Sequence, residues 1–84
     1  MRIYEVDKDD YKRLKDRNER PEQLICMAIM NLDVQPVTAA PKETVKIRLY
    51  LAKEEFKTLD RKAKAVGVST ASVIRGITMA LARR

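Results

Sequence analysis

The stretch TVKIRLYLAKEEF, residues 44–56, constrains the fold most because its apolar period changes within a few residues. From Val45 to Leu51 apolar and polar residues alternate, as in a strand with one buried face. From Ala52 onward the apolar residues recur every three or four positions, as on an amphipathic helix. They are Phe56, Leu59, Ala63 and Val66. The sequence therefore predicts a strand that runs directly into a helix.

The residues after this helix predict a second one. Gly67 follows the last apolar position and is the residue type most common just past a helix end. Ser69 is a favourable N-cap, so the second helix is expected from about Thr70 to Ala82. Together with Phe56 and Leu59, its apolar face is assigned to the core: Val73, Ile74, Ile77 and Leu81. Residues 44–82 thus have the order strand, helix, turn, helix.

Gly76 interrupts the second predicted helix. Glycine inside a helix costs roughly 1 kcal/mol relative to alanine. We therefore expect a close approach at this position, where two strand-helix-helix units contact each other.

The chain divides into two parts joined by a linker. Residues 34–43 contain Pro36 and Pro41 and show neither a helical nor a strand period, which is typical of a linker. Residues 1–33 therefore form a first part and residues 44–84 a second part.

The first part resembles the second when the two are aligned. VDKDDYKRL, residues 6–14, agrees in chemistry with LAKEEFKTL, residues 51–59, at seven of nine positions. After a gap of four residues, Leu24, Ile25, Ile29 and Leu32 fall on Val73, Ile74, Thr78 and Leu81. This pattern indicates an internal repeat. Two unrelated amphipathic helices can also share such spacing, so a chance match is the alternative.

Charge separates the two parts as well. The chain has 84 residues and a net charge of +6. Residues 1–43 hold eight basic and nine acidic side chains, whereas residues 44–84 hold ten and three. The second part is therefore expected to face a polyanion such as nucleic acid, an acidic protein surface or anionic lipid. A single domain of this size has a marginal core unless it duplicates its elements or self-associates.

Several functional classes are disfavoured by composition. There is no His, and the single Cys26 lies in the apolar run LICMAIM, which suits a buried thiol in a reducing cytoplasm. No nucleophile with a base, glycine-rich phosphate loop or zinc ligand set occurs, so we expect no catalysis, cofactor or metal. No segment approaches the ~18 apolar residues of a membrane span, and the chain has no Trp to anchor it at a membrane surface.

The layout strand, helix, G-x-S turn and helix over residues 44–82 resembles the ribbon-helix-helix family of DNA-binding proteins, the class of the Arc, MetJ and CopG repressors. The resemblance implies an α+β, mostly helical fold. Two units would pair their strands into an antiparallel ribbon that enters the DNA major groove, while four helices form a shared core. The duplication within this chain would place both units in one compact domain.

The same resemblance assigns the residues that contact DNA. The outward strand residues that would read bases are Lys46, Arg48 and Tyr50. Their chemistry fits, because Lys and Arg donate to guanine O6 and N7. The start of the second helix would bind phosphate through Ser69, Thr70 and Ala71, since free N–H groups and the helix dipole favour an anion there. Lys64 and Arg75 are assigned as supplementary phosphate ligands.

The first part departs from the family pattern. Its strand RIYEV places Ile3 and Glu5 where the second part has Arg48 and Tyr50. It also lacks the G-x-S turn: Pro21 is expected at a first helical position, and Arg17 and Arg20 are its only phosphate candidates. Residues 1–33 are therefore interpreted as a degenerate copy.

Two architectures and two functions follow. In one architecture, residues 2–6 pair with residues 45–51 within the chain, as in tandem accessory proteins of conjugative plasmids. In the other, residues 44–84 form a homodimer that carries the first part as an arm, as in plasmid partition and copy-control regulators. The leading hypothesis is a sequence-specific double-stranded DNA-binding protein, either a transcriptional regulator or a plasmid maintenance or transfer factor. The alternative is an antitoxin-like module whose residues 1–33 bind a protein partner.

Overall fold

The computed structural model describes residues 1–31 and 35–84, which form two strands and four helices. In chain order they are β1 (Arg2–Asp7), α1 (Lys8–Asp16), α2 (Pro21–Asn31), β2 (Thr44–Leu49), α3 (Lys53–Val66) and α4 (Thr70–Ala82). The α+β, mostly helical class is therefore confirmed. Leu32 and the predicted boundary at residues 33 and 34 lie outside the described residues.

The two strands form an antiparallel ribbon within one chain. Tyr4 is opposite Ile47 and Ile3 is opposite Arg48. The predicted pairing of residues 2–6 with residues 45–51 is confirmed up to Leu49, where β2 ends. The first part of the chain therefore supplies half of the sheet and is not an appended arm.

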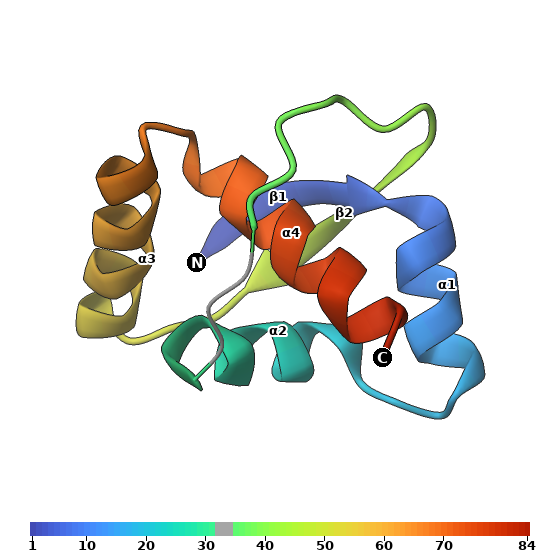
Figure 1. The fold of residues 1–84 in the computed structure, drawn as a ribbon. Helices are drawn as coiled ribbons and strands as arrows, with labels where there is room; N and C mark the ends of the chain where they lie inside the picture. Colours follow the sequence, from blue (N-terminus) through green and yellow to red (C-terminus); the bar gives the residue numbers. More distant parts are fainter. Residues whose placement is uncertain (32–34) are drawn as a thin grey trace.

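The ribbon has one buried and one exposed face. Tyr4 and Val6 on β1 and Ile47 and Leu49 on β2 are buried, and the residues between them are exposed. Helices α1, α2 and α4 contact the ribbon, with α4 crossing it at the centre of Figure 1, and α3 packs on α4 and α2. Because α4 contacts β1 and each of the other three helices, it is the centre of the core.

Local capping explains where the helices begin and end. The Asp7 side chain accepts hydrogen bonds from the backbone N–H groups of Asp9 and Asp10, which starts α1. Gly67 ends α3 with a positive φ of 72°, a conformation that glycine adopts without steric cost. Ser69 accepts a hydrogen bond from the Ser72 N–H and starts α4. The predicted bounds of α4 are thus confirmed.

The linker lies against α4. The Val37 N–H donates to the Ser72 carbonyl oxygen at 2.9 Å. At Gly76, an added Cβ would overlap the Gln35 carbonyl oxygen and lie 3.1 Å from Pro36 Cα. The expected close approach at Gly76 therefore exists, but the expectation of a contact between units was wrong: the partner is the linker backbone.

Most of the predicted core is confirmed. Leu59, Val73, Ile74, Ile77 and Leu81 are buried. Phe56 and Cys26 are partly buried against this core, and burial raises the pKa of the Cys26 thiol.

Val66 was wrongly assigned to the buried stripe of α3. It is 58% exposed, because it is the last residue of α3 and lies beyond Ala63, the last buried position of that stripe.

Among residues 1–31 and 35–84, no single helix combines the length and apolar character required to cross a membrane. Among these residues, α3 and α4 taken together reach that length and apolar composition, but they are bent by 97° at the break between them.

Candidate nucleic-acid interface

The exposed face of the ribbon brings the three predicted base-reading residues together. Lys46 and Arg48 extend from β2, and Tyr50 follows its last residue. All three are exposed, Tyr50 by 71%. With Ile3 and Glu22 they line one hollow of about 550 Å³. Strand alternation places Ile3, Lys46 and Arg48 on this face, because every second side chain of a strand points to the same side.

The neighbours of these residues differ between the two strands. Across the ribbon, Arg48 is opposite Ile3 and Lys46 is opposite Glu5. The ion pairs among the described residues are Arg2–Asp60, Lys8–Glu43 and Arg17–Glu19, so neither Lys46 nor Arg48 takes part in one. The ribbon face therefore carries the hydrogen-bond donors of Lys46 and Arg48 beside the carboxylate of Glu5. It is not a uniformly basic surface.

Glu22 is the member of this hollow that the sequence pattern did not single out. It lies in the first turn of α2, and its Oε1 accepts a 2.6 Å hydrogen bond from the Tyr11 hydroxyl. Burial and this bond raise the pKa of Tyr11 to about 12. The alignment of the two halves could have identified this residue. With its four-residue gap, Glu22 aligns with Ala71, so the first half has a carboxylate at the position where the second half has a proposed phosphate contact.

The start of α4 has the features expected of a phosphate site. Ser69 is exposed, and Lys64 is exposed in the last turn of α3. Within residues 1–31 and 35–84, no acceptor bonds the backbone N–H groups of Thr70 or Ala71. These groups lie in the first turn of the helix, where the dipole favours an anion. The structure leaves this end of α4 open to a ligand.

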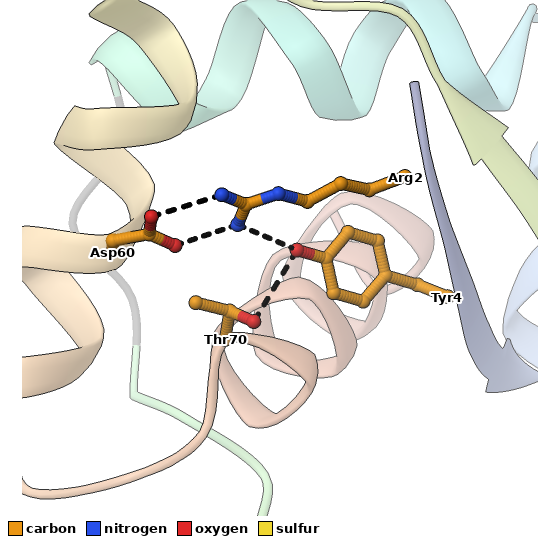
Figure 2. A network of polar contacts seen from close by, with 4 residues as sticks. All are labelled: Arg2, Tyr4, Asp60 and Thr70. Atoms are coloured by element: carbon orange, nitrogen blue, oxygen red, sulfur yellow. Dashed lines mark hydrogen bonds and ion pairs between the residues drawn. The ribbon is translucent and has the colours of Figure 1, made fainter. Parts of the chain in front are cut away.

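A polar network joins this helix start to the ribbon (Figure 2). The Tyr4 hydroxyl donates to Thr70 Oγ1 at 3.2 Å and accepts from Arg2 Nη1 at 3.4 Å. The Arg2 guanidinium also donates two hydrogen bonds to Asp60, at 2.6 and 2.9 Å. These bonds lower the pKa of Asp60, because they stabilise its carboxylate. The network thus fixes the first turn of α4 relative to β1.

Arg75 lies in a different setting from the other predicted phosphate ligands. Its Nε donates to the Val37 carbonyl oxygen at 3.0 Å, and its Nη2 donates to Ser72 Oγ at 3.1 Å. In this structure its guanidinium holds the linker on α4. Its assignment as a phosphate ligand stays a prediction.

The corresponding region of the first half carries Arg17 and Arg20, its predicted phosphate candidates. Pro21 begins α2, as predicted. The Arg17 guanidinium donates to the carbonyl oxygens of Leu81, at 2.7 Å, and Arg84, at 3.4 Å, and so binds the C-terminal end of α4. Arg20 is exposed next to Pro21. The turn before α4 contains the small residues Gly67 and Ser69, whereas Arg20 and Pro21 stand at the start of α2.

Among the described residues, no three His, Cys, Asp or Glu side chains gather as a metal site. Comparison with family models, with curated proteins and with solved structures finds no match for this chain.

Proposed function

We propose that this chain is a sequence-specific double-stranded DNA-binding protein whose ribbon enters the major groove. The observation that carries the proposal is the exposed ribbon face, on which Lys46, Arg48 and Tyr50 line one hollow. Burying the opposite face against the helices leaves these side chains free to reach outward. No chemical step is part of this function.

The dimensions of the ribbon suit this role. Two paired strands lie about 4.8 Å apart, and the major groove is about 12 Å wide and admits a two-stranded ribbon. Arg48 would donate to guanine O6 and N7, and Ile3 opposite it would contact a thymine methyl group. Glu5 would accept from cytosine N4. With these contacts the ribbon would distinguish bases both by hydrogen bonds and by apolar contact.

We infer that the chain is a tandem ribbon-helix-helix unit with unequal halves. The order strand, helix, helix occurs in both halves, and the strands of the two halves pair with each other. The halves are unequal because Arg48 lies opposite Ile3 across the ribbon. In addition, the first half has Glu22 at the position that aligns with Ala71, one of the proposed phosphate contacts. Such a protein would recognise an asymmetric site, as a transcriptional regulator or as a plasmid maintenance or transfer factor.

The test compares DNA binding by two charge-matched double variants. Lys46→Ala/Arg48→Ala removes two cations from the ribbon, and Lys12→Ala/Arg13→Ala removes two exposed cations from α1. Binding to duplexes selected from a random pool would be followed by fluorescence anisotropy across a salt series. Loss of the Arg48 contact alone should cost about 1 to 3 kcal/mol on the selected site and less on random DNA.

The two variants separate a base contact from a general charge effect. Loss of phosphate contacts weakens binding to all sequences and reduces its salt dependence, whereas loss of base contacts removes the preference for one sequence. The ribbon variant should therefore lose preference for the selected site, and the α1 variant should keep it. Equal losses in both variants, or no selected sequence at all, would contradict the proposal.

A protein partner on α2 is the second candidate function. Met27 and Met30 are 58% and 51% exposed on this helix of the first half. Flexible thioether side chains are frequent at protein-binding surfaces. Copurification of a stoichiometric partner, lost in Met27→Lys/Met30→Lys and kept in the ribbon variant, would support it.

A further inference from the structure

A second hollow lies away from the exposed ribbon face, between the start of α1, the linker and the C-terminal half of α4. Its volume is about 220 Å³. Apolar walls come from Val37, Pro41 and Met79, and charged groups come from Asp10, Arg75 and Arg83. It is therefore an apolar cavity with opposite charges at its edge, the general character of a small-molecule site.

Asp10 is the unusual member of this cavity. As a residue it is 6% exposed, but its carboxylate oxygens remain accessible to solvent, and they make no hydrogen bond or ion pair with residues 1–31 or 35–84. Its backbone N–H is bonded to Asp7, but its side chain is not part of that cap. Asp10 lines the hollow, so a partner from outside the chain can reach its accessible oxygens. A carboxylate in this state is suited to bind a cationic group from outside the chain.

The surroundings show what such a ligand must carry. Desolvation and then the charge of Asp7 raise the pKa of Asp10, while Arg83 and Arg13 oppose the rise. Arg83 is therefore close enough to act on Asp10 without forming an ion pair. In Arg75, Nε and Nη2 are occupied by Val37 and Ser72, so Nη1 remains for another acceptor. The hollow is therefore lined by a carboxylate, Asp10, and by two guanidinium groups, Arg75 and Arg83.

We propose that this cavity binds a small zwitterion, an α-amino acid with an aliphatic side chain. Asp10 would accept from its ammonium group, Arg83 would donate to its carboxylate, and its side chain would pack on Met79 and the linker. At about 30 Å³ per water, the volume holds about seven water-sized groups. This fits an amino acid of medium size and is too small for a nucleotide. The site is independent of the DNA-binding proposal.

The experiment is a thermal-denaturation titration of the whole chain with L-leucine, L-valine and L-methionine as probes. Isoamylamine lacks the carboxylate and isocaproate lacks the ammonium group, so they test each half of the recognition. The melting temperature should rise with amino-acid concentration, as ligand binding to the folded state requires, and rise less with either half-ligand. Amide chemical shifts from NMR should change at residues around the cavity, Met79 among them.

Two matched pairs of variants assign the roles. Asp10→Asn should weaken binding by about tenfold or more, because a charged hydrogen bond is lost, and Asp9→Asn, in the same helical turn but exposed, should not. Likewise Arg83→Gln should weaken binding and Arg84→Gln should not. In the absence of ligand, Asp10→Asn should not lower the melting temperature, because no protein partner is removed.

Three results would overturn the proposal. In the first, none of the three amino acids raises the melting temperature. In the second, Asp10→Asn binds them as the parent does. In the third, Asp10→Asn and Arg83→Gln each destabilise the ligand-free protein to a similar extent. That would mean the two side chains pair with each other in solution and leave no site.

Discussion

Replacing Gly76 by alanine tests the position of the linker on α4, because two physical effects of opposite sign meet there. Helix propensity alone favours alanine over glycine in a helix interior by about 1 kcal/mol. In the structure, however, the new Cβ would overlap the Gln35 carbonyl oxygen and crowd Pro36 Cα at 3.1 Å. Both are backbone atoms, which cannot move aside as the end of a flexible side chain can.

The expected cost follows from what must move. Overpacking of this kind costs about 1 to 3 kcal/mol. Displacing the linker would also weaken its two hydrogen bonds to α4, from the Val37 N–H to Ser72 and from Arg75 to the Val37 carbonyl, at about 1 kcal/mol each. After subtracting the propensity gain of about 1 kcal/mol, Gly76→Ala should lower the free energy of unfolding by about 2 to 4 kcal/mol.

Urea denaturation followed by circular dichroism measures this difference directly. The parent and Gly76→Ala should have the same dependence on denaturant and different midpoints. Ala80→Gly, which removes a methyl group from the same helix, serves as a control for propensity, with an expected loss of about 1 kcal/mol. If Gly76→Ala raises the midpoint by the amount that Ala80→Gly lowers it, propensity alone governs the site and the linker does not lie on α4.

Two further predictions concern buried polar groups. Tyr4→Phe removes the hydroxyl that bonds Thr70 at 3.2 Å and should cost about 1 kcal/mol in urea denaturation; an unchanged midpoint would show that the bond adds nothing. The raised pKa of Asp10 means that its contribution to stability is present below its ordinary pKa of about 3.8 and is lost as pH rises through the higher folded value. The melting temperature of Asp10→Asn should therefore exceed that of the parent by a margin that grows as pH rises above about 3.8; a margin that shrinks with pH would contradict this reasoning.

The second half of the chain was predictable at the level of elements because its signals are local. Alternation over residues 45–49 and the three-to-four spacing after Ala52 reflect backbone geometry that neighbouring residues determine. Gly67 and Ser69 mark a turn whose φ value and side-chain cap involve only nearby atoms. The exposed row of Lys46 and Arg48 follows from the same alternation.

The pairing of the two halves was predictable from a longer-range pattern. Matching apolar positions in residues 6–14 and 51–59 indicated that both halves carry a strand followed by a helix. A lone strand leaves its backbone groups unpaired, so two strands in one small chain favour pairing with each other. The antiparallel register in the structure agrees with that argument.

The sequence by itself determined the elements, the two faces of the ribbon and the row of candidate base-reading residues. Only the tertiary structure decided that Gly76 meets the linker, that Arg75 bonds Val37 and that Glu22 lies beside the ribbon. It also decided that Asp10 lines the hollow between α1, the linker and α4, with no side-chain partner among residues 1–31 and 35–84. The physical reason is that these environments join atoms far apart in sequence, and their identity depends on how α4 and the linker pack. A local period predicts which face of an element is buried, but it carries no information about which distant atoms cover that face.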